Sequence, residues 1–312
     1  MEKIGLVVPC YNEEPSIRLF YSTVETVFAK MKAHGMHYDY EYLFINDGSK
    51  DRTLTIIKEL RKKDPKHVHY ISFARNFGKE SAMAAGFNYV KGDYVAEMDV
   101  DLQDPPSLLP KMIKYIKNDG YDCVGCIQTS RKQNPVRAFL SKHFYGILDR
   151  ISNVQIKPNV RDFRLMTRQF LDNFLQLKER NRFTKGLFSW VGFRVKFLKY
   201  PGRPRAAGKS DWSLHALFNY SLEAIIDFSD VPLKIATVTG GLSCLLAFLG
   251  LFFVVIRSLF FGDAVAGWPS LVSIILLIGG IQLFCLGIIG KYIGKIYLEV
   301  KHRPLYTIKE MK

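Results

Sequence analysis

Cysteine is scarce in this sequence, at five in 312 residues, which excludes the disulfide-rich class of small secreted domains. Cys123 and Cys126 form a C-x-x-C motif, but the sequence has no second cysteine pair to complete a zinc site. The motif lies within an apparent strand, so we expect two small, buried, apolar side chains. His143 and His215 lie on or near apolar helical stripes, and we expect structural roles for them rather than metal binding.

The glycine motifs of common nucleotide-binding folds are missing. No G-x-G-x-x-G follows the first apolar run, which argues against a dinucleotide-dependent oxidoreductase. No G-x-x-x-x-G-K-[ST] is present either, which argues against a P-loop ATPase.

The first apolar run, Ile4–Pro9, has only six residues and is too short for the core of a secretory signal. We therefore expect a cytoplasmic catalytic part with reduced thiols.

Acidic residues are rare in one segment. Residues 131–210 hold 19 basic and 4 acidic side chains, whereas residues 1–130 hold 17 and 18 and residues 211–312 hold 8 and 7. The net charge of +15 therefore comes from a single stretch. Its partner should be an anion, namely a phosphate, a nucleic acid or an anionic lipid surface.

Charge is absent from two long apolar runs near the C-terminus. Ile235–Ile256 and Trp268–Gly290 are long enough to cross a bilayer, which takes about 20 apolar residues. Two buried core helices are the alternative. The tail 291–312 has six basic and two acidic residues, so the positive-inside tendency predicts that it is cytoplasmic. We expect a multi-pass protein of the cell inner membrane, with its N-terminal part and tail on the cytoplasmic face.

The first 130 residues alternate between short apolar runs and segments with helical spacing. This pattern predicts an α/β domain with a mostly parallel sheet. The predicted strands are Ile4–Val8, Tyr42–Ile45, His69–Phe73, Tyr94–Met98 and Asp122–Thr129. The predicted helices are Ser16–His34, Thr53–Lys63, Ser81–Val90 and Ser107–Asn118.

Polar clusters follow four of the predicted strands. In parallel sheets ligands bind at the carboxyl ends of strands, so these clusters should share one site. They are Cys10–Glu13, Asn46–Ser49, Arg75–Lys79 and Asp99–Asp104.

Two carboxylates, Asp99 and Asp101, occupy alternate positions after the fourth strand, and Gln103 follows closely. Oxygen donors of this kind suit Mg²⁺ or Mn²⁺, which commonly bind one or two carboxylates together with substrate phosphates. Such a cation would neutralise a leaving diphosphate. A D-x-D motif taken alone is equally compatible with a solvated loop.

Five sequence motifs occur in order along the chain. They are Val7–Glu14, Ile45–Ser49, Ala74–Lys79, Met98–Pro106 and Asp162–Met166. In this order they resemble the motifs of family 2 glycosyltransferases with the GT-A fold. The narrower resemblance is to polyprenyl-phosphate glycosyltransferases, namely bactoprenol glucosyltransferases and relatives of dolichol-phosphate mannose synthase. The resemblance covers about residues 4–215.

The resemblance assigns roles to individual residues. It implies a metal, Mg²⁺ or Mn²⁺, held by Asp101 and Gln103. It implies a nucleotide-sugar site lined by Pro9, Tyr11, Asn12, Glu13, Asp47, Asn76, Lys79, Asp99, Val100 and Arg131.

The acceptor side rests on later motifs. The resemblance makes Asp162 and Arg164 catalytic and places Arg164, Arg205 and Ser210 at the acceptor phosphate. Asp162 is either a general base or a residue that positions the acceptor or completes the metal shell. Arg164 is either a fork for a phosphate oxygen or part of a structural salt bridge with a nearby acid. Relatives often continue with Lys-Tyr where this chain has Asp211-Trp212, so the acceptor contacts there differ.

Three regions follow from these patterns. Residues 1–210 form the GT-A domain, residues 211–234 a juxtamembrane amphipathic helix, and residues 235–312 the two spans with a basic tail. A second basic amphipathic helix is predicted over Ala138–Ile151, which suits an anionic membrane surface. The alternative for both amphipathic helices is that their apolar faces pack on the protein core or on another subunit.

The predicted function is inverting, metal-dependent transfer of a sugar from a nucleotide sugar to polyprenyl (undecaprenyl) phosphate. The resemblance favours UDP-glucose as the donor and a homotetramer as the assembly. N-acetylglucosamine, mannose and galactose remain alternatives as the sugar, and a protein or polysaccharide remains an alternative acceptor. A non-catalytic nucleotide-sugar sensor is the alternative outside enzymes. Nucleic-acid binding would explain the basic stretch but not the apolar runs, so we expect no nucleic-acid partner.

Overall fold

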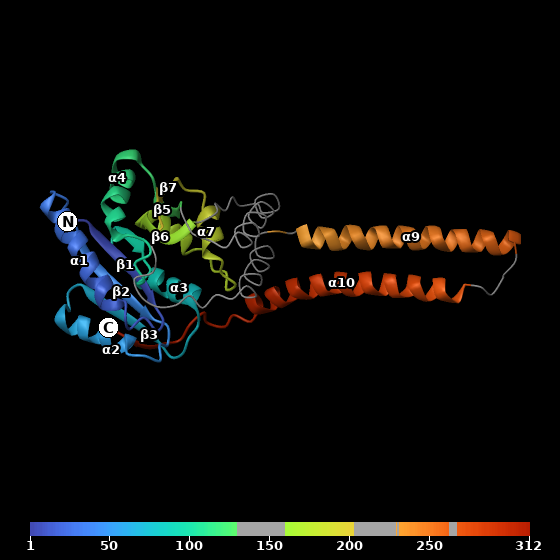
Figure 1. Ribbon diagram of the computed structural model, residues 1–312, viewed down its shortest axis with the longest axis horizontal. Coiled ribbons are helices and arrows are strands. Elements are labelled where there is room, and N and C mark those ends of the chain that lie inside the picture. The colour runs from blue at the N-terminus through green and yellow to red at the C-terminus, as the bar shows by residue number, and fades with distance from the viewer. Residues whose placement is uncertain (130–159, 203–228, 230, 262–266) are drawn as a thin grey trace.

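The computed structural model describes residues 1–129, 160–202, 229, 231–261 and 267–312 (Figure 1). The strands of the described residues form one sheet. They are β1 (Lys3–Cys10), β2 (Asp39–Asn46), β3 (Val68–Phe73), β4 (Tyr94–Glu97), β5 (Cys123–Gln128), β6 (Val160–Thr167), β7 (Val195–Tyr200) and β8 (Ile308–Met311). The helices are α1 (Ile17–Ala33), α2 (Thr53–Lys63), α3 (Lys79–Tyr89), the 3₁₀ turn η1 (Pro106–Leu108), α4 (Leu109–Asp119), α6 (Arg168–Phe174), α7 (Thr184–Trp190), α9 (Val231–Phe261) and α10 (Trp268–Val300).

The sheet is mixed, with the strand order β7-β5-β6-β4-β1-β2-β3-β8. Strand β1 lies in its centre and pairs in parallel with both β2 and β4. The pairings β2–β3 and β5–β7 are also parallel, whereas β6 runs antiparallel to β4 and β5, and β8 to β3. The predicted alternation of strands and helices in the first 130 residues is confirmed, with small differences at the element ends.

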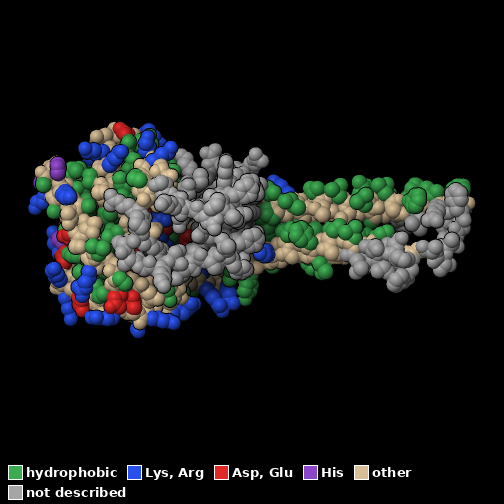
Figure 2. All heavy atoms as spheres, in the orientation of Figure 1, with side chains coloured by type: hydrophobic (Ala, Val, Ile, Leu, Met, Phe, Trp, Pro, Cys, Tyr) green, Lys and Arg blue, Asp and Glu red, His purple; other side chains and the backbone are tan. Residues whose placement is uncertain are grey.

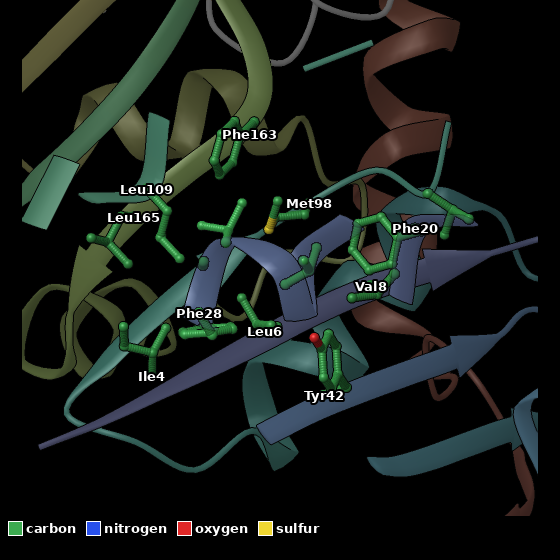
Figure 3. Packing of buried hydrophobic residues seen from close by; sticks show 14 of the residues in the cluster. Ile4, Leu6, Val8, Phe20, Phe28, Tyr42, Met98, Leu109, Phe163 and Leu165 are labelled. Atoms are coloured by element: carbon green, nitrogen blue, oxygen red, sulfur yellow. The ribbon is translucent and has the colours of Figure 1, made fainter. Parts of the chain in front are cut away.

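Apolar side chains on both faces of the sheet form the core, as expected for buried parallel strands. Along β1, Ile4, Leu6 and Val8 face a cluster that includes α1, α2 and α4 (Figure 3). Val7 faces the opposite cluster, which includes α3, α6 and α7. A Cβ on Gly86 of α3 would come within 2.2 Å of Val7 Cγ1, so glycine is needed for this helix to lie close to the sheet.

The last residues of the chain return to the sheet and form its edge strand β8. Tyr70 and Lys312 exchange backbone hydrogen bonds of 2.9 and 3.0 Å. The Tyr306 ring stacks on Phe73 with centroids 5.0 Å apart. The sequence predicts no strand here, because a four-residue segment in a basic tail shows no hydrophobic pattern that would indicate one. The pairing with β3 creates this strand.

The two apolar helices α9 and α10 extend side by side away from the domain that contains the sheet (Figure 1). The Tyr292 hydroxyl, in the C-terminal part of α10, donates to the carbonyl oxygen of Ser229, just before α9, at 2.7 Å. Helices α9 and α10 are both long and apolar enough to cross a membrane, α9 over Val231–Gly250 and α10 over Leu277–Val300. Only 6% of the first stretch and 0% of the second is buried inside the protein. Their described hydrophobic side chains project outward (Figure 2). This arrangement contradicts the alternative of buried core helices.

Candidate functional site

The loops that follow β1 and β2 are joined by hydrogen bonds. The Asn12 N–H donates to Ser49 Oγ at 3.0 Å, and the Lys50 N–H donates to Asn12 Oδ1 at 2.9 Å. Asn12 has a positive φ of 54°, a conformation that asparagine tolerates better than most residues. The Glu13 N–H donates to Thr53 Oγ1 at 2.8 Å. These contacts bring the predicted donor-binding residues of the first two loops together and set the loop shape.

Asp47, at the end of β2, is bound by the backbone of the third loop. Its two carboxylate oxygens accept from the N–H groups of Phe77 and Gly78 at 2.7 and 2.9 Å. Burial raises the pKa of Asp47, and the two backbone hydrogen bonds partly offset this. The Asp47 carboxylate therefore holds the 75–79 loop, next to the neighbouring Lys79.

A chain of ion pairs joins three elements at the centre of the site. Lys79 Nζ, at the start of α3, contacts Asp99 Oδ1 at 2.6 Å and also Asp162 Oδ2. Lys185 Nζ, on α7, contacts the other oxygen, Asp162 Oδ1, at 3.2 Å. Asp99 follows the carboxyl end of β4, and Asp162 lies on β6. Because β6 runs antiparallel to β4, both carboxylates lie at the same end of this strand pair.

The charges in this chain keep both Asp162 and Lys79 ionised. Burial alone would raise the pKa of Asp162, but Lys185 and Lys79 hold it well below its usual range. Burial alone would lower the pKa of Lys79, but Asp162 and Asp99 hold it well above its usual value. A carboxylate with so low a pKa is a weak proton acceptor, so the geometry favours a positioning role for Asp162 over general-base catalysis.

Arg164 lies beneath this chain in a buried pair with Glu97. Its Nε lies 3.4 Å from Glu97 Oε2 and also donates to the Asp162 carbonyl oxygen at 3.2 Å. Its guanidinium stacks on the Phe188 ring at 3.7 Å. Arg164 and Glu97 are almost fully buried, and burial raises the pKa of Glu97 well above its usual value. The structure therefore contains the salt bridge that was the alternative for Arg164, and this contact leaves the predicted phosphate fork untested.

The metal-binding prediction concerns the loop after β4. Asp101 Oδ1 accepts from the Gln103 N–H at 3.1 Å, while Gln103 Oε1 accepts from Arg161 at 2.9 Å. The carboxylates of Asp99 and Asp101 are hard oxygen donors and fit Mg²⁺ or Mn²⁺. A guanidinium on Gln103 Oε1 competes with a cation at that oxygen. Within the described ranges no group of three or more His, Cys, Asp or Glu side chains is arranged to hold a metal, so substrate oxygens would have to complete the shell.

The remaining predicted residues have varied surroundings. Pro9 pairs with Ile45 in the β1–β2 ladder, and Tyr11 and Asn76 are exposed in the loops above it. Val100 is buried, so only its backbone is available to a ligand. Arg131, Arg205, Ser210, His143, His215 and the two predicted amphipathic helices lie outside the described residues.

The prediction for the C-x-x-C motif is confirmed. Cys123 and Cys126 are buried in β5, and burial raises the pKa of Cys123 to about 12. Burial therefore keeps the Cys123 thiol protonated at neutral pH, as expected for a small apolar side chain within a strand.

Sequence reasoning missed several residues that build the site. Lys185 and Thr184 lie on the short helix α7, and Thr184 donates to the half-buried Glu80 of α3. Arg161 binds Asp104 through Nε at 2.9 Å. None of them follows a predicted strand, and their long-range partners leave no local pattern. The basic stretch was the only signal that included Arg161 and Lys185.

A family model, glycosyl transferase family 2, matches residues 6–175. Relatives match along the whole length. The bactoprenol glucosyl transferase of Shigella phage SfV is 43% identical over 311 residues, covering 99% of each chain. The putative glycosyltransferase CsbB of Bacillus subtilis is 42% identical over 307 residues, covering 98% of this chain and 91% of that one.

Solved structures give a more distant likeness. Glucosyl-3-phosphoglycerate synthase from Mycobacterium tuberculosis, crystallised with Mn²⁺, UDP-glucose and phosphoglyceric acid, is 18% identical with a TM-score of 0.46. The match covers 72% of this chain and 78% of that one. No inference about ligands follows at this level of similarity.

Proposed function

Because this chain belongs to glycosyl transferase family 2 and is a glycosyltransferase, we propose that it transfers a sugar from a nucleotide sugar to a polyprenyl phosphate at a membrane surface. The names of full-length relatives at 42–43% identity support glucose as the sugar and bactoprenol, an undecaprenyl lipid, as the carrier. UDP is the favoured nucleotide on the resemblance alone. The observation that carries the proposal is the chain of ion pairs Asp99–Lys79–Asp162–Lys185, which lies at the carboxyl end of β4. The same protein has two apolar helices that are long enough to cross a membrane.

The donor side of the proposed site is built from Asp99, Asp101 and Lys79. Asp101 and Gln103 would hold Mg²⁺ or Mn²⁺ together with the donor diphosphate, with the Asp99 carboxylate beside them as a further oxygen donor. When bound, the cation would supply positive charge against the negative charge that develops on the leaving diphosphate. Lys79 Nζ lies 2.6 Å from Asp99 and adds a fixed positive charge beside the same position.

The acceptor needs little activation. A phosphate monoester has a second pKa near about 6, so the polyprenyl phosphate is largely a dianion at neutral pH. One of its oxygens attacks the anomeric carbon from the face opposite the diphosphate. The new carbon–oxygen bond forms as the old one breaks, the nucleoside diphosphate leaves with the bonding electrons, and the anomeric configuration inverts. No proton has to be removed, which agrees with the low pKa of Asp162.

Two features of the chain support a membrane location for this reaction. The apolar helices α9 and α10 leave their hydrophobic side chains exposed, which is stable in lipid but costly in water. The basic segment 131–210 would attract both a lipid phosphate and an anionic surface.

A transfer assay tests the proposal. The protein is purified in detergent and mixed with undecaprenyl phosphate, Mg²⁺ or Mn²⁺ and a panel of radiolabelled nucleotide sugars, and label is followed into the organic phase. We expect label from UDP-glucose, abolished by EDTA and restored by excess divalent cation. Asp101→Ala should lower the rate by about 100-fold or more, because charge stabilisation at a leaving group is commonly worth this much.

A matched control is Asp119→Ala, which removes an exposed carboxylate at the end of α4 and should leave the rate unchanged. Transfer from a different nucleotide sugar would correct the choice of glucose. An absence of transfer from every donor, with nucleotide-sugar binding intact, would refute the polyprenyl phosphate acceptor.

A further inference from the structure

Lys185 is a cation of the site that no strand-end motif predicted. It lies on α7, and its Nζ is 3.2 Å from Asp162 Oδ1, while Lys79 takes Asp162 Oδ2. The two ammonium groups therefore flank one carboxylate on opposite oxygens. The Lys185 side chain keeps 30% of its surface exposed. Since a lysine ammonium has three donors, hydrogen-bonding capacity remains beyond the contact with Asp162.

The two lysines belong to different sides of the site. Lys79 also binds Asp99, next to Asp101 and therefore on the donor side. Lys185 contacts the oxygen of Asp162 that Lys79 does not contact. An anion beside Lys185 would thus lie next to Asp162, with Lys79 between Asp162 and the donor carboxylate Asp99.

The element that carries Lys185 is tied to the second apolar helix. Glu299, near the end of α10, accepts from the backbone N–H groups of Arg180 and Asn181 through Oε1, at 2.7 and 3.1 Å. At its first residue α7 is also joined to α3, because the hydroxyl and the N–H of Thr184 both donate to Glu80 Oε2. Figure 1 shows α7 on the side of the catalytic domain that faces α9 and α10. Lys185 therefore lies between the donor carboxylates and the C-terminal end of the apolar helix α10.

We propose that Lys185 binds the phosphate of the acceptor lipid, and that Glu299 acts as a positioning residue by fixing the segment before α7. The proposal rests on the proposed function and names the residue that receives the lipid head. A polyprenyl chain held in the bilayer beside α10 presents its phosphate near the end of the candidate span Leu277–Val300, where α10 carries Lys291, Lys295 and Glu299. Lys185 is a described cation of the reacting centre, and it follows closely after the segment that Glu299 binds. A charge-assisted hydrogen bond from its ammonium would hold the phosphate beside Asp162.

Steady-state kinetics of the full-length protein in detergent tests this assignment, with undecaprenyl phosphate and the nucleotide sugar varied separately. Lys185→Gln should raise the KM for undecaprenyl phosphate by about 10- to 100-fold, the usual worth of a charged hydrogen bond. The KM for the nucleotide sugar should stay within about twofold, because Lys185 does not contact the donor carboxylates. Lys185→Arg keeps the charge and should recover part of the acceptor affinity.

Glu299 has its own pair of variants. Glu299→Ala removes the acceptor for both backbone N–H groups and should raise the acceptor KM by about three- to tenfold. Glu299→Gln keeps a carbonyl oxygen and should have a smaller effect. Lys111→Gln, an exposed lysine on α4, is the matched control and should change neither KM.

The outcomes separate this inference from the proposed function. Wild-type protein that transfers no sugar to undecaprenyl phosphate would refute the proposed function, and the role of Lys185 with it. Wild-type transfer with an unchanged acceptor KM in Lys185→Gln would refute the role of Lys185 alone. Equal rises in both KM values, or loss of nucleotide-sugar binding measured by calorimetry, would show a structural role for Lys185 and also overturn the assignment.

Discussion

At the scale of single residues, the site is organised around one carboxylate and its cations. Asp162 is bound by Lys79 and Lys185, and Arg164 donates to its backbone carbonyl oxygen. A general base works best with a pKa near the working pH, and Lys185 and Lys79 hold the pKa of Asp162 well below its usual range. This low pKa supports the proposal that Asp162 acts as a fixed negative charge between two ammonium groups.

The pH dependence of transfer should therefore follow the acceptor. Lys185 and Lys79 hold the pKa of Asp162 well below its usual range, so Asp162 should contribute no acidic limb between pH 5 and 8. We expect kcat/KM to rise with pH through a midpoint near about 6, as the polyprenyl phosphate loses its second proton. The measurement is the pH profile of transfer between pH 5 and 8.

The control replaces the acceptor by a phosphonate analogue with a higher second pKa. The midpoint should move upward with the acceptor. A midpoint that stays in place with the analogue and disappears in Asp162→Asn would instead assign the proton transfer to Asp162.

At the scale of elements, the edge strand β8 supports the loop that carries Lys79. The Ala74 N–H donates to the Thr307 carbonyl oxygen at 3.0 Å, directly before the 75–79 loop. Glu310 binds Lys58 Nζ at 2.6 Å and accepts from the Tyr70 hydroxyl at 2.5 Å. The tail that follows α10 thus both covers a sheet edge and restrains an active-site loop.

Docking of β8 should weaken in acid. The hydrogen bonds from Lys58 and Tyr70 lower the pKa of Glu310 below its usual value of 4.5. The stabilisation from this carboxylate is therefore complete above the unfolded pKa and is lost as the pH falls through the folded pKa. Amide hydrogen exchange in β3 should be faster in Glu310→Gln than in wild type at pH 7, and the difference should shrink at pH 4.

Lys309→Gln on the same strand is the matched control, since Lys309 is exposed, and it should exchange like the wild type. Equal protection of β3 in Glu310→Gln and wild type at pH 7 would show that the Glu310 contacts do not hold the strand.

At the scale of the whole molecule, the two apolar helices return the chain to the catalytic domain. Helix α9 leaves the domain, α10 comes back beside it, and β8 joins the sheet that β1 began (Figure 1). If both helices cross a bilayer, the catalytic domain and the C-terminal strand must lie on the same side. The connection between the helices then lies on the opposite side.

Cysteine labelling tests this topology in a variant whose Cys244 and Cys285 are replaced by serine. Gly267→Cys, at the start of α10, should react with a membrane-impermeant maleimide in intact spheroplasts, because it lies at the far end of the helices. Lys309→Cys should react only in inside-out vesicles. Labelling of both positions from the same face would contradict a two-span arrangement.

Much of the fold was predictable because it is encoded locally. The strands and helices of the first 130 residues follow from apolar runs and helical spacing, and the polar clusters after β1 to β4 follow from chain order in a parallel sheet. Asp99 and Asp101 were predictable as a site for the same reason. The two apolar helices follow from length and composition alone.

The sequence by itself determined the class of the protein, the polar clusters after β1 to β4 and the two apolar helices, since each depends on residues that are close together in the chain. Only the tertiary structure decided which distant residues meet. It placed Lys185 on Asp162, buried Arg164 against Glu97 and brought Glu299 to the segment before α7. It also made the tail an edge strand. Such contacts arise from packing between elements far apart in sequence, and their side chains carry no local pattern that distinguishes them from an ordinary charged surface.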